Sequence, residues 1–346
     1  MPKKRKILSS IIKNNQKVLS DFYYKYIFLI IIFGCILIGL VFYKLDAHII
    51  LFGDTPSALG EYVKTVATGL GGALVILGLW INNRRVAEQT RQNNIAEKGQ
   101  INTRFKDAAT LLGSGNVSSI ISGVYALHQI ALESSEEKGM QRGYVSIIHD
   151  ILCTYIRENT EIIVNKDTGK EWLENSKPTI VIQTIIKVLF KNNEFIYSDL
   201  MTDLSNCVFE NIDFDNAYIT NVDFTKSKFI KSSAQNCSFN SCYMENSFID
   251  EMDFADSSFE KVIFDSSHIK NSNFSKTELR NCDYWESIIY NTKFDDVIFE
   301  NADFKNAVFE GQVTFKNTIL ARHTLEEIKT NSNILTRIKE NTQTKS

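Results

Sequence analysis

Residues and motifs that carry chemistry are scarce in this sequence of 346 residues. Its 5 histidines are dispersed, with no HExxH motif and no Cys/His spacing typical of a zinc site. The glycine stretches GLGG and GSG lack the strand, spacing and lysine of a phosphate-binding loop, and DTGK lacks its leading glycine. We therefore predict a protein that is not an enzyme, without catalytic residues, metal site or cofactor.

One stretch carries a regular pattern instead. In steps of five from residue 204 to residue 309, all 22 positions are apolar and 13 are Phe. A period of five fits neither the 3.6-residue helix nor the two-residue strand, so it predicts a repeat architecture. The predicted inward core consists of Phe209, Phe214, Phe224, Phe229, Phe239, Phe254, Phe259, Phe264, Phe274, Phe294, Phe299, Phe304 and Phe309.

Two further positions of each repeat are also restricted. A small residue stands two before nearly every large one, with Ile212 and Met252 as bulky exceptions. A chain that turns a corner every five residues sends both registers inward, so that small and large side chains pack side by side. Asn is frequent two residues after the centre, where a corner favours a residue that tolerates tight turns.

The segments CVFEN, IDFDN, VDFTK, MDFAD, CDYWE and ADFKN resemble the motif of the pentapeptide-repeat family. The resemblance covers about a third of the chain. It implies an all-β, right-handed quadrilateral β-helix with four repeats in each coil. Coils of this kind stack about 4.8 Å apart through backbone hydrogen bonds.

The six cysteines are not expected to form disulfides. Four of them occupy the small inward register and no two of these are 20 residues apart, so none would stack in neighbouring coils. We interpret all six as small core residues in a reducing compartment. The four are Cys207, Cys237, Cys242 and Cys282, while Cys35 lies in an apolar run and Cys153 in a predicted helix.

Two apolar runs near the N-terminus predict membrane-spanning helices. Residues 23–43 contain about 18 uninterrupted apolar residues, enough to cross a bilayer core. The second run, residues 63–81, is interrupted by glycines but is long enough to span. Lys and Arg precede the first run and follow the second, whereas the connecting segment is mostly acidic. The positive-inside rule then places both termini in the cytoplasm of a multi-pass protein of the bacterial inner membrane.

The remaining segments predict helices around the repeats. A polar stalk continues from residue 82, and an αα-hairpin follows over residues 117–157. A segment that opens at Pro178 is apolar nearly all round and is expected to cap the first coil. The predicted organisation is a basic cytoplasmic N-terminus (1–20), a two-helix transmembrane hairpin (21–82), a cytoplasmic α-helical stalk and capping domain (83–192), the β-helix (193–315), and a C-terminal capping helix and tail (316–346).

Large apolar residues also occur at outward positions of the repeats. They gather on two adjoining sides of the predicted coil, and we expect them to pack against the helical region or a second protomer. This candidate protein-interaction surface consists of Val208, Ile230, Tyr243, Phe248, Ile263, Trp285, Ile288, Tyr290 and Val308.

These features predict a membrane-anchored cytoplasmic scaffold or protein-interaction module that presents the repeat rod. Its expected partners are the lipid bilayer and a protein of unknown identity, and a homo-oligomer is left open. One alternative is a membrane-acting effector, for example in phage defence, that perturbs the bilayer on assembly. Another is a DNA mimic that binds topoisomerase, as some members of the resembled family do. Membrane anchoring and the lysines of the rod argue against that reading, and nucleic acid is not an expected partner.

Overall fold

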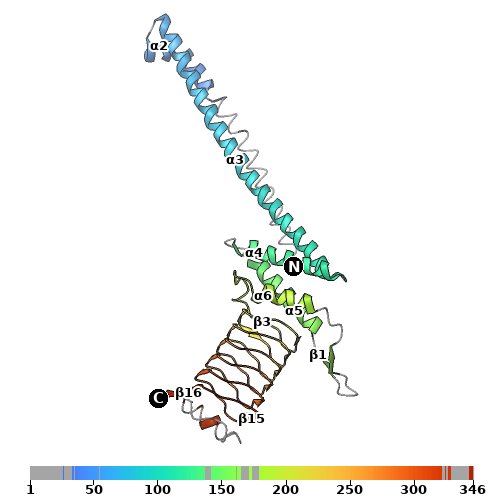
Figure 1. The fold of residues 1–346 in the computed structure, drawn as a ribbon. Coiled ribbons are helices and arrows are strands. Elements are labelled where there is room, and N and C mark those ends of the chain that lie inside the picture. The colour runs from blue at the N-terminus through green and yellow to red at the C-terminus, as the bar shows by residue number, and fades with distance from the viewer. Residues whose placement is uncertain are drawn as a thin grey trace, which may run out of the picture. The chain divides into compact units, whose positions relative to one another are not determined.

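The structure is a computed structural model that describes most of the chain (Figure 1). The described residues are 26, 33–34, 36–53, 55–136, 142–160, 162–164, 171–173, 179–321, 324, 326–328 and 343–345. The chain divides into two compact units, Met1–Lys98 and Gly99–Ser346. The predicted basic N-terminus and much of the first predicted span lie outside the described residues.

The first unit is helical throughout its described part. Residues 36–44 are helical, and α2 (Ala47–Phe52) leads to α3 (Pro56–Leu112), a helix of 57 residues that contains the unit boundary. The hydroxyl of Tyr62 on α3 donates a hydrogen bond of 2.6 Å to the carbonyl of Gly39, in the helix over residues 36–44. Among the described residues, one helix is long and apolar enough to cross a membrane, and it is α3 from Ser57 onward.

Three helices open the second unit after α3. They are α4 (Val117–Glu136), α5 (Arg142–Thr160) and α6 (Thr179–Phe190). α4 packs against both α5 and α6, around buried side chains such as Leu127, Ile148 and Ile185. α4 passes very close to the end of α3, because a Cβ built on Gly123 would lie 2.7 Å from the backbone nitrogen of Leu112. The apolar periodicity that predicted an αα-hairpin corresponds to α4 and α5.

The connection between α5 and α6 differs from the sequence-based expectation. No strand pair was predicted for this part of the α-helical capping domain, but β1 (Ile162–Val164) and β2 (Glu171–Leu173) pair in antiparallel fashion. Three residues on each side are too few for a two-residue periodicity to stand out. The pairing therefore follows from contact between the two segments.

The rest of the second unit is a four-sided coil of parallel strands (Figure 1). Strands of the same side pair with a spacing of 20 residues, for example Phe239 with Phe259, so one turn contains four five-residue repeats. The strands are β3 (Thr202–Asp203), β4 (Val208–Glu210), β5 (Tyr218–Thr220), β6 (Val222–Asp223), β7 (Lys228–Ile230), β8 (Ser238–Asn240), β9 (Phe248–Asp250), β10 (Ser258–Glu260), β11 (His268–Lys270), β12 (Glu278–Arg280), β13 (Ile288–Tyr290), β14 (Ile298–Glu300), β15 (Val308–Glu310), β16 (Ile319–Ala321) and β17 (Gln343–Lys345).

We name the four sides by their strands. Face A contains β4, β7, β9, β11, β13 and β15, and face C contains β5, β8, β10, β12, β14 and β16. Face B is held by single bridges from Asp213 to Thr314. Face D begins with β3 and β6 and continues as single bridges through Tyr243, Ile263, Asp283 and Asp303.

Phenylalanine fills the interior of this coil. The 13 inward phenylalanines named above are all buried, none being more than 5% exposed. Rings of one face stack from coil to coil, with centroids 4.7 Å apart for Phe239 and Phe259 and 4.6 Å apart for Tyr284 and Phe304. This spacing matches the distance of about 4.8 Å between hydrogen-bonded strands. Each buried Phe contributes about 1.5–3 kcal/mol, so the five-residue pattern supplies the core that stabilises the coil.

The corners explain the frequency of Asn. The residue two after each centre has a positive φ, between 48° and 61° along the coil from Asn206 to Asn317, with Gly311 at 68°. This left-handed conformation costs an ordinary L-residue about 1–2 kcal/mol, and Asn tolerates it better than most. On alternate faces the corner is a tight turn closed by a backbone hydrogen bond, such as Ala217 N to Phe214 O at 2.9 Å.

The coil also extends beyond the predicted boundary at residue 315. One extra residue is inserted at Gly311, after which partners are 21 residues apart, as in the bridge from Lys293 to Thr314. The inward register then resumes at Phe315 and Leu320, and strand β16 ends at Ala321. Of the predicted C-terminal capping helix, only residue 324 and residues 326–328 are described as helical.

Polar side chains satisfy the open backbone at both ends of the coil. Gln183 of α6 donates to the carbonyl of Asp213 at 2.6 Å and accepts from its N–H at 2.9 Å. At the other end, the carboxylate of Glu327 accepts from the backbone N–H of Phe304 at 3.1 Å. Thr324 donates to the carbonyl of Ala302 at 2.9 Å. The side chains thereby replace the strand that a further coil would provide.

Candidate interaction surface

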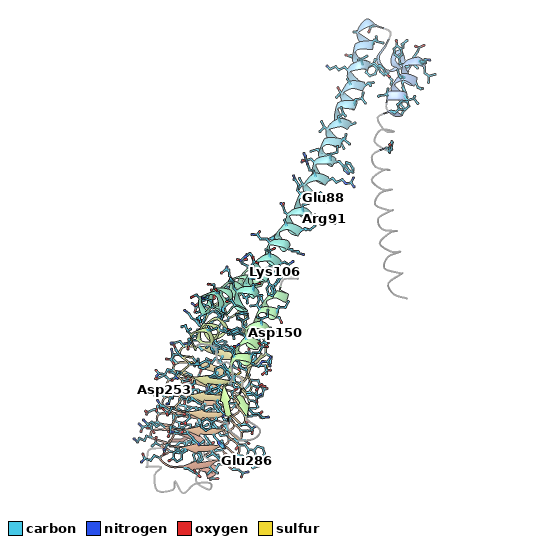
Figure 2. All side chains as sticks on the ribbon, turned by 90° about the vertical axis from the view of Figure 1, so that its right-hand side faces the viewer. Glu88, Arg91, Lys106, Asp150, Asp253 and Glu286 are labelled. Carbon is cyan, nitrogen blue, oxygen red and sulfur yellow. The ribbon has the colours of Figure 1, made fainter. Side chains whose placement is uncertain are left out.

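The outer surface of the coil consists of columns of side chains, because residues 20 apart stack in register. Within each repeat the residues on either side of the buried centre point outward. Figure 2 shows one such side chain, Asp253, and the corner residue Glu286 on the outside of the coil. A partner that approaches the coil therefore meets columns whose chemistry is set by every fourth repeat.

The sequence-predicted surface residues lie on two adjoining faces. Face A carries six of them and face D carries Tyr243, Ile263 and Trp285. Trp285 is 44% exposed and Tyr243 is 40% exposed, whereas Ile263 is half-buried. On face A, Tyr290 and Val308 are exposed and the other four are half-buried: Val208, Ile230, Phe248 and Ile288.

The helical region was one of the two partners expected for this surface, and it lies elsewhere. Helix α5 contacts strand β3, and α6 holds Asp213 of the first coil, so the helices cover the N-terminal end of the coil. Trp285 and Tyr290 lie four coils further along and are exposed. The expectation that helices of the same chain bury this surface is therefore wrong for these two residues.

The sequence analysis missed two exposed apolar residues on face C, Tyr218 and Ile298. Tyr218 is contacted edge-on by Phe195, with ring centroids 5.0 Å apart. Phe195 lies in the turns that follow α6, over residues 191–200, and has a φ of 49°, which is unusual for a bulky residue. The outward position of Tyr218 in its repeat was a signal that could have placed it on the surface.

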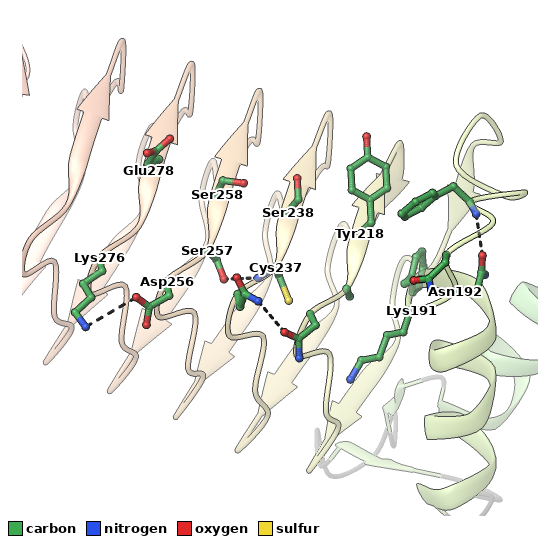
Figure 3. A pocket seen from close by; sticks show the side chains of 16 residues that line it. Lys191, Asn192, Tyr218, Cys237, Ser238, Asp256, Ser257, Ser258, Lys276 and Glu278 are labelled. Carbon is green, nitrogen blue, oxygen red and sulfur yellow. Dashed lines mark hydrogen bonds and ion pairs between the residues drawn. The ribbon is translucent and has the colours of Figure 1, made fainter.

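A shallow groove starts at this aromatic pair and follows the corner between faces B and C (Figure 3). Its volume is about 490 Å³. Its floor is a ladder of small residues, Ala217, Cys237 and Ser257. Asp256 and Lys276 line one wall, and the Lys276 Nζ lies 3.9 Å from the Asp256 Oδ1. The lining is polar and carries charges of both signs, and it contains no pair of groups arranged for acid–base or nucleophilic catalysis.

Face D is the most acidic part of the candidate surface. Asp265 and Asp283 both have a raised pKa, first because of partial burial and then because of repulsion from neighbouring carboxylates. For Asp265 the repelling groups are Asp283, Glu245 and Asp303. The hydrogen bond that its carboxylate accepts from the backbone N–H of Trp285, 2.9 Å long, opposes the shift. The exposed tryptophan therefore lies within a set of mutually repelling carboxylates.

One buried cluster lies where α5 meets the first coil. The His149 Nε2 lies 2.8 Å from the Thr202 hydroxyl and 3.6 Å from the Cys153 Sγ. A histidine beside a cysteine is a potential nucleophilic pair. Burial raises the pKa of the Cys153 thiol to about 12, so the thiolate needed for attack does not form near neutral pH. We interpret the cluster as structural.

The described residues contain no group of three or more His, Cys, Asp or Glu side chains arranged to hold a metal ion. The described cysteines, Cys153, Cys207, Cys237, Cys242 and Cys282, are free thiols and are buried. The sixth cysteine, Cys35, lies outside the described residues.

A four-sided coil of five-residue repeats defines a β-solenoid repeat protein. The family model for pentapeptide repeats matches residues 202–233 and 272–311, with 8 copies. The coil thus carries pentapeptide repeats, which are generally found in structural or interaction proteins rather than enzymes. A search of curated proteins found no match.

Solved structures of pentapeptide-repeat proteins resemble the coil. One is Rfr23 from the cyanobacterium Cyanothece 51142, with 14% identity and a TM-score of 0.30, covering 36% of this chain and 96% of that one. A trypsin-treated form of QnrB1, a plasmid-mediated fluoroquinolone resistance protein, has 17% identity and a TM-score of 0.23, covering 42% and 76%. Because these TM-scores are low, no argument about function rests on the two structures.

Proposed function

We propose that this chain is a non-enzymatic protein-interaction module, anchored in the bacterial inner membrane, that presents its repeat coil to a partner in the cytoplasm. The observation that carries the proposal is helix α3. From Ser57 it is apolar over enough residues to cross a bilayer, and none of that apolar window is buried by the rest of the protein. A helix of this composition is stable in lipid and would be costly to expose to water.

The second unit supports the role in binding. Its coil is held together by backbone hydrogen bonds between successive coils. The coil exposes aromatic side chains on faces A and D, where they are available to a partner. The predicted helix over residues 23–43, of which residues 26, 33–34 and 36–43 are described, and the cytoplasmic placement of both termini belong to this proposal.

Cell fractionation and site-specific crosslinking test the proposal together. A photoreactive amino acid at Tyr290 on face A should give adducts with a discrete partner in the membrane fraction. The same residue at Ser275 on face B, whose outward side chains are polar, is the matched control and should give none. The proposal fails if carbonate washing removes the protein from the membrane, or if both positions give the same adducts.

A membrane-acting effector is a second candidate. Around Gly60, Gly69, Gly71 and Gly72 of α3 there is open space, with nothing within 4 Å of an added Cβ. Small residues allow membrane helices to approach closely, so this part of α3 has room for a second helix. Overexpression should then cause leakage of a vesicle-entrapped or cytoplasmic dye, and the leakage should disappear when residues 1–82 are deleted. An intact bilayer at high expression would reject this candidate.

A further inference from the structure

Face D exposes an aromatic patch that nothing in the described part of the chain covers. Tyr243, Ile263 and Trp285 lie in three successive coils, and Trp285 and Tyr243 are 44% and 40% exposed. The backbone of this face is fully paired in the sheet direction, because bridges connect Tyr243 to Ile263 and Ile263 to Asp283. A partner would therefore contact the side chains of this patch, because the paired backbone leaves no strand edge to which a partner strand could add.

Four carboxylates frame the patch. They are Glu245, Asp265, Asp283 and Asp303, which occupy the same two outward columns as the aromatic residues. None of these four has an ion pair among the described residues. We call these four carboxylates and the three apolar residues the Trp285 patch.

Some carboxylates elsewhere on the coil form ion pairs within the chain. Asp213 pairs with Lys191 at 2.7 Å, and Asp203 pairs with Arg157 of α5. On face C, Glu278 pairs with Arg280 at 2.9 Å. These three carboxylates thus have a cation of the same chain within reach. In the patch, the negative charge is left for another molecule to neutralise.

The charge of the patch also acts on itself. Repulsion among the carboxylates, together with partial burial, raises the pKa of Asp265 and of Asp283. A cation placed between these groups would relieve the repulsion and lower both pKa values again. Binding of a cation at a pH where these carboxyls are partly protonated would therefore be accompanied by the release of protons.

We propose that the Trp285 patch docks an arginine-bearing segment of a partner polypeptide. A planar guanidinium stacks on an indole face and at the same time donates two parallel hydrogen bonds to a carboxylate. Trp285 with Asp283 beside it and Asp265 one coil below supplies both elements. The inference rests on the proposed function as an interaction module and names the chemistry of the partner.

Two other occupants fit the observations less well. A divalent cation prefers several oxygen ligands that converge on one point. Here, one oxygen of Asp265 already accepts a hydrogen bond from the backbone N–H of Trp285. One oxygen of Asp303 accepts one from the backbone N–H of Lys305 at 2.8 Å. The coil of a second copy would bring like charge, because residues 200–311 contain 20 acidic and 9 basic residues. A basic partner segment avoids both difficulties.

Isothermal titration of the full-length protein in a zwitterionic detergent tests the inference. The probe is an acetylated peptide of alternating glycine and arginine, and the matched probe replaces each arginine with citrulline, which keeps the shape and removes the charge. The arginine peptide should bind and the citrulline peptide should not. In a titration series towards acidic pH, the heat of binding should also come to depend on the ionisation enthalpy of the buffer, since protons are released.

Variants assign the binding to the patch. Trp285→Ala should weaken arginine-peptide binding by about 3- to 30-fold, as expected for the loss of a cation–π contact, and Trp285→Phe should restore part of it. Asp283→Asn should weaken it by about fivefold or more, since a charge-assisted hydrogen bond is lost. On other faces, Tyr218→Ala and Asp295→Asn are matched controls that should leave binding unchanged. Thermal melts of each variant check that the coil is intact.

Several results would overturn the inference. Equal binding of both peptides, equal binding by Trp285→Ala, or displacement of the peptide by Mg²⁺ at equimolar concentration would each do so, and so would an absence of binding at millimolar peptide. These outcomes leave the proposed function standing if crosslinks from Tyr290 persist. Failure of membrane association, in contrast, would remove the proposed function without affecting peptide binding.

Discussion

At the scale of single residues, several polar atoms in the interior of the coil are satisfied by the backbone. The inward hydroxyls of Ser227 and Ser257 donate to the carbonyls of Leu204 and Ala234, both at 2.7 Å. The hydroxyl of Tyr284, like those of Ser247 and Ser267, is buried and has no hydrogen-bond partner among the described residues. Such a group costs about 1–3 kcal/mol relative to a satisfied one.

Tyr284→Phe should therefore stabilise the protein. The ring stacks between Phe264 and Phe304, at 4.8 and 4.6 Å, and those contacts are unchanged by loss of the hydroxyl. We expect the free energy of unfolding of the coil to rise by about 1 kcal/mol, seen as a higher urea midpoint with an unchanged slope. The exposed Tyr243→Phe is the control and should have no effect. A lower midpoint for Tyr284→Phe would show that the hydroxyl is satisfied in solution.

The buried histidine at the joint between α5 and the first coil gives a second residue-scale prediction. His149 is 2% exposed, and desolvation lowers its pKa below 6.5 although Asp150, at 3.5 Å, acts in the opposite direction. The unfolded state thus binds a proton at a higher pH than the folded state. Stability from the neutral imidazole is complete above about pH 6.5 and is lost as the pH falls towards the folded-state pKa.

His149→Gln should flatten this dependence. The melting temperature of the native protein should decrease between pH 7.5 and pH 5.5, and the variant should show a smaller decrease. His128 contributes in the same direction, because its pKa is also lowered by desolvation. The exposed His268→Gln on face A is the matched control and should keep the native dependence. Identical pH profiles for the native protein and His149→Gln would contradict the assignment.

At the scale of elements, one glutamine of α6 makes the backbone hydrogen bonds that a preceding coil would make. The side-chain amide of Gln183 bonds both the N–H and the C=O of Asp213, as a neighbouring strand would do. Lys191, just after the helix, adds an ion pair to the Asp213 carboxylate and, with it, lowers the pKa of that carboxyl against the effect of desolvation. The end of the coil is thereby protected from pairing with another chain.

Gln183→Ala should open this end. We expect a loss of about 1 kcal/mol in local stability, because two hydrogen bonds disappear. Amide hydrogen exchange should accelerate at Asp213 and its neighbours in the first coil, while coils further along keep their protection. Gln183→Glu is the matched control, since it keeps the acceptor and loses the donor, and its effect should be intermediate. Uniform acceleration along the whole coil would argue that α6 acts on the fold in general rather than on its end.

The elements differ in how far the sequence predicts them. The coil follows from a local rule, because every fifth residue is apolar and each corner residue has a positive φ from Asn206 onward. The β1–β2 pair, the Gln183 cap and the insertion at Gly311 depend on contacts between distant segments, which a local pattern does not contain. The five-residue pattern places Tyr218 at an outward position, but its ring contact with Phe195 depends on the turns over residues 191–200.

At the scale of the whole molecule, the two units bury their apolar surface in different ways. The unit Gly99–Ser346 encloses its own core of helices and stacked phenylalanines. In the unit Met1–Lys98, large apolar side chains of α3 such as Leu74, Val75 and Ile76 are more than half exposed. Surface of that kind is what the proposed bilayer anchor would remove from water. The two units are thus expected to separate cleanly by solubility.

Deletion of residues 1–98 should move the protein from the membrane pellet to the soluble fraction, with a circular dichroism spectrum that keeps its β-sheet signal. A point variant tests the same idea within the full chain, because a charge at the centre of a spanning helix disfavours insertion by about 2.5–3.5 kcal/mol. Leu74→Arg should therefore reduce the membrane-bound fraction, whereas Leu74→Ile should not. If full-length protein carrying Leu74→Arg stays in the pellet after a carbonate wash as completely as the native chain, α3 does not span the bilayer at this point and the anchor must lie elsewhere.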